Sequence, residues 1–372
     1  MKIAQVAPLY ESVPPKLYGG TERVVSALTE ELVAQGHDVT LYASRDSVTK
    51  ARLVPGCRRS LRLDTDCKDQ IAHHLLMLDR VFRDRDNFDL IHFHIDYLHY
   101  PLSRRCDLHH VTTLHGRLDI PDLQPLYRSF YDMPVVSISH SQRTPLSWVN
   151  WQGTVHHGLP LNQFKVHRGH GKYLAFLGRV SPEKGLERAI ETAERAGMEL
   201  KIAAKIDRAD KEYFDAVIKP LLKHPLIEFI GEIGHPEKND FLGNAYALLF
   251  PIGWPEPFGL VMIEAMSCGT PVIAYPCGSV PEVMEHGVTG FVVPDVNGAV
   301  RALPAVPQLN RIEIRQRFEE RFSANRMTRE YVRIYRRLIR EEGAALTLSG
   351  GVSVGRGNHP TVLHSDEVGA SG

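Results

Sequence analysis

The sequence has few of the features that mark secreted, membrane-spanning or nucleic-acid-binding proteins. Its 372 residues include five cysteines and no Cys-x-x-Cys pair, which favours a reduced, cytoplasmic protein over a disulfide scaffold. No run approaches the roughly 20 apolar residues of a membrane-spanning helix, and residues 1–10 resemble a first strand rather than a signal peptide. The 44 basic residues equal the 44 acidic ones, so no nucleic-acid partner is expected.

Familiar phosphate and metal signatures are also missing. No Gly-x-x-x-x-Gly-Lys-[Ser/Thr] loop occurs, and the glycine pair at 19–20 is not part of a Gly-x-Gly-x-x-Gly turn. Asp-x-Asp triplets at 64–66 and 84–86 lie in charged stretches that we expect to be exposed. A further cluster consists of His92, His94, His99 and Asp96. Three interpretations of it stay open: a zinc site, contacts with an acceptor, or structural roles.

What the chain does contain is a regular alternation of strand and helix patterns. A strand, an amphipathic helix that stops at Gly36 and a second strand form one βαβ unit within residues 2–44, which predicts a parallel sheet. The pattern restarts near residue 172. The length and this restart predict two doubly wound α/β domains, 1–160 and 161–322.

A basic amphipathic helix is predicted over 323–342, followed by a disordered tail over 343–372 that is rich in Gly and Ser. Its arginines are expected to form a solvated face. Because a basic amphipathic helix can also lie on anionic lipid, a peripheral contact with the inner membrane surface stays open.

The strongest phosphate-binding signal is "GRVSPEKG" at 178–185. A strand ends there, Ser181 and Pro182 suit the start of a helix, and Arg179 and Lys184 bring two cations to its first turn. Cations at the positive end of a helix are unfavourable unless an anion offsets them. The arrangement therefore favours phosphate binding over a plain surface turn.

A second signal is "EPFGLVMIE" at 256–264. Glu256 precedes a proline and should be extended, whereas Glu264 lies inside the following helix and leans back toward its N-terminus. Gly259 leaves free amides at that terminus, where an anion can bind. Two carboxylates beside an anion site suit a ligand with hydroxyl-rich ends and a diphosphate, which describes a nucleotide sugar. The alternative is an acidic helix terminus with an exposed Glu264.

These segments, taken in order, resemble glycosyltransferase family 4, the retaining enzymes of GT-B fold. The resemblance spans about residues 1–341, and the segments that carry it are "GGTE" (19–22), "TLHG" (113–116), "GRVSPEKG" (178–185), "EPFGLVMIE" (256–264) and "GSVPEVMEHGVTGFVV" (278–293). It implies two Rossmann-like domains that face a cleft, with the C-terminal helix crossing back to the first domain.

The resemblance also implies roles for individual residues. Arg179 and Lys184 would hold the donor diphosphate, Glu264 the ribose and Glu256 the transferred sugar. We expect Phe258, Gly259 and Leu260 to contact the donor, the last two through backbone amides. His115 would lie beside the reacting centre, and Gly19 and Gly20 would close on the donor from the acceptor domain.

One segment departs from the family pattern, because a glycine-rich turn is replaced by "KIDRAD" (205–210). Lys205 could contact phosphate or ribose there. The sequence thus predicts a sugar transferase that needs no metal or other cofactor, with an unidentified hydroxyl acceptor. Alternatives are a sugar-nucleotide epimerase or hydrolase and a non-catalytic nucleotide-sugar-binding protein. A glycoside hydrolase would not need the cationic diphosphate site.

Overall fold

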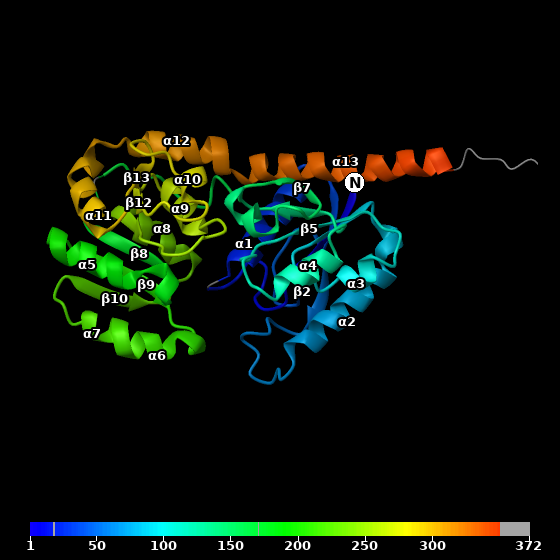
Figure 1. The fold of residues 1–372 in the computed structure, drawn as a ribbon, viewed down its shortest axis with the longest axis horizontal. Coiled ribbons are helices and arrows are strands. Elements are labelled where there is room, and N and C mark those ends of the chain that lie inside the picture. The colour runs from blue at the N-terminus through cyan, green and yellow to red at the C-terminus, as the bar shows by residue number, and fades with distance from the viewer. Residues whose placement is uncertain (18, 170, 350–372) are drawn as a thin grey trace, which may run out of the picture.

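The computed structural model describes residues 1–17, 19–169 and 171–349. Two α/β lobes lie side by side, each built on one sheet (Figure 1). All strand pairs are parallel. The expected pair of doubly wound parallel-sheet domains is therefore confirmed.

The N-terminal domain contains a seven-stranded sheet with the order β3-β2-β1-β4-β5-β6-β7. Its elements are β1 (Lys2–Val6), α1 (Gly20–Ala34), β2 (Asp38–Ser44), β3 (Arg52–Cys57), α2 (Gln70–Arg83), β4 (Leu90–Phe93), α3 (Tyr100–Ser103), β5 (His110–Thr113), α4 (Leu123–Ser129), β6 (Val135–Ser137) and β7 (Trp151–Thr154), with 3-10 turns at Arg85–Asn87 and Ser141–Leu146. The strand order reverses between β1 and β4, and a ligand crevice is expected at the carboxyl ends of those two strands.

The C-terminal domain contains a six-stranded sheet with the order β10-β9-β8-β11-β12-β13. Its elements are β8 (Tyr173–Arg179), α5 (Leu186–Ala196), β9 (Leu200–Lys205), α6 (Lys211–Tyr213), a π turn (Phe214–Ile218), α7 (Lys219–Leu221), β10 (Ile227–Gly231), α8 (His235–Gly243), β11 (Ala245–Phe250), α9 (Leu260–Ser267), β12 (Val272–Ala274), α10 (Val280–Val283), β13 (Gly290–Val292), α11 (Val296–Ala302) and α12 (Arg311–Phe322), with 3-10 turns at Pro182–Lys184, Arg208–Asp210 and Leu303–Gln308. Here the order reverses between β8 and β11.

One long helix, α13 (Ala324–Ser349), leaves the C-terminal lobe and runs along the N-terminal lobe (Figure 1). Met327, Tyr331 and Tyr335 lie in the same buried cluster as Ile3 of β1 and Leu28 of α1. Apolar residues at helical spacing thus make the tertiary contact, as the amphipathic pattern predicts. No helix among the described residues is both long and apolar enough to span a membrane.

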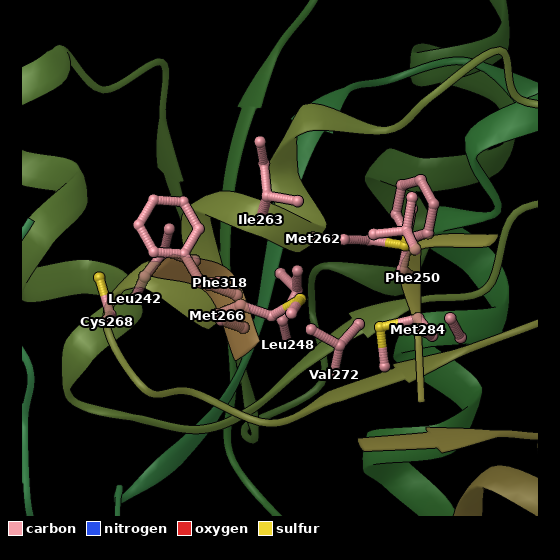
Figure 2. Close-up of a cluster of buried hydrophobic side chains, with 14 of the residues drawn as sticks. Leu242, Leu248, Phe250, Met262, Ile263, Met266, Cys268, Val272, Met284 and Phe318 are labelled. Atoms are coloured by element: carbon pink, nitrogen blue, oxygen red, sulfur yellow. The ribbon is translucent and has the colours of Figure 1, made fainter. Parts of the chain in front are cut away.

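The core of the C-terminal domain fixes α9, the helix that carries Glu264. Figure 2 shows Met262 and Met266 of α9 beside Phe250 and Leu248 of β11, with Phe318 of α12 on the other side. All five side chains are buried. Because packed interiors leave little room for movement, α9 is held in a defined position below the cleft.

The structure departs from the sequence-based expectations in two regions. The strand β3 and the helix α2 are not among the elements that the sequence patterns predict, and β3 contains Pro55. Pro55 is compatible with β3 because this strand lies at the sheet edge. The predicted start of the tail at residue 343 is also wrong, because α13 continues to Ser349. The rest of that tail, 350–372, lies outside the described residues.

Buried guanidinium groups fasten α12 to the rest of the domain. Arg315 donates hydrogen bonds to the carbonyl oxygens of Leu161 (2.6 Å), Phe164 (3.0 Å) and Ser267 (2.6 Å). Two of these carbonyls belong to the segment that connects the domains, and the third ends α9. A single side chain therefore joins the connection, α9 and α12.

We expect Arg315→Ala to lower the free energy of unfolding by about 2–4 kcal/mol, because three buried carbonyls lose a charged donor. Urea denaturation measures this change. The exposed Arg329 of α13 provides the control, since Arg329→Ala should change stability by less than about 0.5 kcal/mol. Equal stability of the two variants would contradict the anchoring role of Arg315.

Candidate functional site

A cleft of about 580 Å³ lies between the two domains. Residues that follow β1, β4 and β5 line one wall. The ends of β8 and β9 and residues that follow β8 and β11 line the other, so both chain reversals open into the same space. Ten of the eleven site residues proposed from sequence line this cleft: Gly19, Gly20, His115, Lys184, Lys205, Glu256, Phe258, Gly259, Leu260 and Glu264.

Lys184 and Glu256 form an ion pair in the cleft. The Lys184 ammonium lies 2.5 Å from Oε2 of Glu256, and both side chains are largely buried. Lys184 ends the 3-10 turn after β8, and Glu256 belongs to the loop after β11. Strands that are neighbours in the sheet thus bring together two residues that are 72 positions apart.

The backbone near Glu256 is held by the loop after β12. The carbonyl oxygen of Glu256 accepts a hydrogen bond from the amide of Ser279 (3.0 Å), and the Ser279 hydroxyl donates to the carbonyl of Phe258 (2.8 Å). A Cβ atom at Gly278 would lie 2.3 Å from the backbone nitrogen of Glu256. Only glycine fits this approach, so the loop defines where the Glu256 carboxylate points.

The N-terminus of α9 opens into the cleft beside this pair. Gly259 begins the helix with a left-handed backbone (φ 76°), and the first amides of a helix have no intrahelical acceptor. A Cβ atom at Gly20 would lie 3.4 Å from Leu260 Cδ1, so the glycine loop of the N-terminal domain abuts this helix end. The positive end of α9 is therefore available to an anion that enters the cleft.

Glu264 does not face the cleft alone. Its Oε1 lies 2.7 Å from Nη1 of Arg23, on α1 of the other domain, and 3.0 Å from the Lys238 ammonium on α8. The side chains are 4%, 8% and 12% exposed, respectively. Burial lowers the pKa of Lys238, and the nearby Glu264 carboxylate opposes this shift. Two cations thus hold the Glu264 carboxylate at the edge of the cleft, and the charge of Glu232 also acts on Lys238.

Sequence reasoning did not identify Arg23 or Lys238 as site residues. Arg23 directly follows "GGTE", and Lys238 lies in "PEKND". In the sequence, each looks like an ordinary basic residue on the polar face of an amphipathic helix. Only the tertiary structure reveals that both point at Glu264, Arg23 from α1 of the other domain and Lys238 from α8 of the same domain.

Arg179 is the proposed site residue that does not line the cleft. Its guanidinium group lies among the carboxylates of Glu183 (2.6 Å), Asp210 (3.4 Å) and Asp207 (3.8 Å). Two of these acids come from "KIDRAD", the segment that departs from the family pattern. The ammonium of Lys205, which does line the cleft, also meets Asp207, at 2.9 Å.

His115 follows β5 and is fixed by a chain of hydrogen bonds. Its Nε2 lies 2.9 Å from His94 Nδ1, and His94 Nε2 lies 2.8 Å from Oε1 of Gln5. Gln5 Nε2 donates to the Tyr335 hydroxyl of α13 (3.3 Å). Because the Gln5 oxygen can only accept, His94 Nδ1 must accept from His115 Nε2. The remaining nitrogen of His115, Nδ1, is then an acceptor, and it is buried without a partner among the described residues.

Burial lowers the pKa of His115 to about 3, so this imidazole is neutral near pH 7. The ring of His115 also stacks on that of His157, with centroids 5.4 Å apart, and His157 in turn contacts Phe258 of the other domain at 4.7 Å. The cleft wall at this point is therefore aromatic and uncharged.

The histidines that suggested a zinc site have other partners. His92 bonds the Tyr335 and Thr113 hydroxyls, and His99 bonds those of Ser103 and Thr112, all at 2.7 Å. Both nitrogens of each ring are thus engaged within the fold. Within the described ranges, no group of three or more His, Cys, Asp or Glu side chains is arranged to hold a metal ion.

Comparison with known proteins agrees with this architecture. Residues 161–325 match the family described as "Glycosyl transferases group 1", and residues 18–151 match "Glycosyltransferase Family 4". An uncharacterized glycosyltransferase of Methanocaldococcus jannaschii is 26% identical, over 78% of this chain and 84% of its own.

Solved structures of glycosyltransferases share the GT-B fold of this chain. AviGT4, a glycosyltransferase involved in avilamycin A biosynthesis, superimposes with a TM-score of 0.73 at 24% identity, over 91% of this chain and 98% of its own. The Anabaena protein HepE, solved with UDP and glucose, gives a TM-score of 0.69 at 17% identity, over 94% of this chain and its full length.

The buried histidines predict how stability depends on pH. Burial lowers the pKa of His92, His94, His99, His115 and His157, so the folded protein cannot take up protons that the unfolded chain binds near pH 6.5. Stability is therefore complete above about pH 6.5 and is lost as the pH falls below it, by up to about 1.4 kcal/mol per pH unit for each histidine.

Urea denaturation at pH 7.5 and 5.5 tests this dependence, and we expect a lower free energy of unfolding at pH 5.5. Glu22, Asp96 and Glu11 act in the opposite direction, because burial raises the pKa of each, to about 7 for Glu22 and about 6 for Asp96, and protonation then favours the folded form; three carboxyls do not offset five imidazoles. A free energy of unfolding that stays constant or rises toward pH 5.5 would contradict the neutral state of these rings.

Proposed function

The chain belongs to the group 1 glycosyltransferases of family 4, and we propose that it moves a sugar from a nucleoside-diphosphate sugar to a hydroxyl acceptor with retention at the anomeric carbon. The observation that carries this proposal is the meeting, in one interdomain cleft, of the Lys184–Glu256 pair, the positive end of α9 and the Glu264 carboxylate with its two paired cations. Together they suit a ligand with a diphosphate between two hydroxyl-rich ends.

Lys184 and the first amides of α9 are the groups that we assign to the leaving diphosphate. Negative charge builds on that group as the sugar departs, and preorganised donors stabilise it without rearranging. Arg179 can reach the same anion only if it leaves its three carboxylates, so we assign it first to holding the turn that carries Lys184. In this scheme the protein cations supply the stabilisation, and no metal ion is needed.

The two glutamates divide the rest of the donor. Glu264 lies deeper in α9, where Arg23 and Lys238 hold its carboxylate and where it can accept hydrogen bonds from ribose hydroxyls. Glu256 lies before the helix, paired with Lys184, where it can hold the transferred sugar. His115 offers its free Nδ1 to a hydroxyl of that sugar.

The transfer itself forms one bond from the acceptor oxygen to the anomeric carbon and breaks the bond from that carbon to the diphosphate. Both events occur on the same face of the sugar. The departing phosphate oxygen takes the proton of the acceptor hydroxyl, so the products are a glycoside and a protonated nucleoside diphosphate. Glu256 is already paired with Lys184, which favours this route over attack by a carboxylate.

The test begins with a thermal-shift screen of UDP-, GDP-, ADP- and dTDP-sugars, with UDP-glucose as the first probe because HepE is solved with UDP and glucose. NMR of the product then gives the anomeric configuration, with and without EDTA, for donor alone and for donor plus acceptor. We expect a retained anomer and undiminished rates in EDTA. An inverted product or loss of activity in EDTA would overturn the scheme, and an epimerised donor without acceptor would indicate an epimerase.

Lys184→Ala tests the leaving-group assignment. Because the ammonium contact strengthens as charge develops, kcat should fall by about 100-fold or more. Lys223→Ala, an exposed lysine of the same domain, should leave kcat unchanged. Steady-state kinetics with the donor from the screen provide the measurement. A rise in KM with an unchanged kcat would mean that Lys184 anchors the donor without stabilising the transition state.

A further inference from the structure

One residue of the N-terminal wall has an unusual backbone and no assigned role. Asp96 lies in the turn after β4, where the amide of Leu98 bonds the carbonyl of Ile95 (3.4 Å). Its φ is +50°, and no other non-glycine residue among those described has a positive φ. This conformation is uncommon outside glycine, and such strain concentrates where a side chain must be presented to a ligand.

The Asp96 side chain is presented to the cleft. It is exposed and lines the interdomain space, and within the described part of the chain no hydrogen bond or ion pair reaches its carboxylate. The side chain stays open to solvent, and partial desolvation by the walls of the cleft raises its pKa to about 6. An exposed carboxylate with no donor from the protein can accept a hydrogen bond from a ligand that displaces water.

The position of Asp96 separates it from the donor site. It follows β4, at the point where the first sheet reverses, whereas the residues assigned to the diphosphate follow β8 and β11 in the other domain. The lysines of that opposite wall each meet another carboxylate: Lys184 meets Glu256, Lys205 meets Asp207 and Lys238 meets Glu264.

The residues that line this part of the cleft are mostly aromatic, apolar or acidic. Tyr10 lines it too; burial raises the pKa of Tyr10, and the charge of Asp96 raises it further. Tyr97 (36% exposed) and Ile71 (46% exposed) line the same part of the cleft. Of the charged groups there, Glu22 is buried and Arg62 is paired with Glu11 at 3.0 Å.

We propose that Asp96 accepts a hydrogen bond from a hydroxyl of the acceptor, and that the acceptor is uncharged around that hydroxyl. This inference rests on the proposed transferase function and names the acceptor class for it. A carboxylate is a strong acceptor for hydroxyls, and tyrosine rings with an aliphatic side chain suit the C–H face of a sugar or an apolar aglycone. A phosphate beside the hydroxyl would be repelled by Asp96.

Asp96→Asn separates this role from a purely structural one. Asparagine keeps the shape of the side chain and tolerates the left-handed backbone, so the turn is retained. A residue needed only for the turn would therefore give an unchanged enzyme. The control is Asp86→Asn, at an 81%-exposed side chain of the same domain outside the cleft.

Three measurements on the wild type and both variants test the proposal: calorimetric binding of the nucleoside diphosphate found in the donor screen, hydrolysis of its sugar nucleotide without acceptor, and transfer to methyl, octyl and p-nitrophenyl glucosides and to glucose 6-phosphate. We expect Asp96→Asn to lower kcat/KM for transfer by about 10- to 100-fold, with diphosphate binding and hydrolysis unchanged. The wild type should prefer the uncharged glucosides.

The remaining outcomes overturn the inference in distinguishable ways. Unchanged transfer by Asp96→Asn, or an equal fall of transfer and hydrolysis, would show that Asp96 does not act on the acceptor. Transfer by the wild type to glucose 6-phosphate alone, or to none of the glucosides, would show that the acceptor class is wrong. A wild type that neither binds a nucleoside diphosphate nor hydrolyses a sugar nucleotide would overturn the proposed function itself, and the inference with it.

Discussion

The chain passes between the two domains twice, near residue 159 and again at residues 322–324. The cleft depends on these two connections, which are hydrogen-bonded to each other. The amide of Leu159 donates to the carbonyl of Phe322, and the amide of Ala324 donates to the carbonyl of Leu159, both at 2.9 Å. A Cβ atom at Gly158 would lie 2.4 Å from the Ser323 oxygen, so the crossings can approach only because glycine is there. With both connections fixed to each other, the carboxyl ends of the two sheets face one space.

A second set of contacts joins the domains around the cleft and depends on charge. Glu282 of α10 accepts hydrogen bonds from His156 Nε2 (3.2 Å) and from the amides of His140 and Ser141, both at 2.7 Å, and these bonds keep its pKa low despite its burial. On the other side, Arg23 reaches Glu264. A buried ion pair contributes little net stability but is costly to break. Such contacts therefore favour one domain arrangement, and a donor that enters must share Glu264 with Arg23 rather than find it free.

The sequence predicts the parts of this protein that depend on local patterns. Helical and strand periodicities identify the doubly wound domains, and "EPFGLVMIE" and "GRVSPEKG" lead to Glu256 and Lys184 because strand ends and helix starts have recognisable residues. What escapes prediction depends on approach in three dimensions. Arg23 reaches Glu264 because the two domains meet there, and Lys238 reaches it because α8 packs beside α9. Arg179 turns away from the cleft because Asp207 and Asp210 follow the neighbouring strand β9. Backbone strain at Asp96 has no sequence signature, since aspartate is common in ordinary turns.

The two walls of the cleft differ in charge, and this difference suits the proposed transfer. The wall from the C-terminal domain carries the lysines and the helix terminus that we assign to the diphosphate of the proposed donor. The N-terminal wall offers neutral imidazoles and the Asp96 carboxylate, and its cations Arg23 and Arg62 are paired with Glu264 and Glu11. A sugar that loses its leaving group develops positive charge at the anomeric carbon, and an imidazolium beside it would oppose that change. Burying His115 in a chain of hydrogen bonds from Gln5 and His94 keeps it neutral. The desolvation of these rings, which makes the fold less stable in acid, is thus the same property that makes the wall compatible with the reacting sugar.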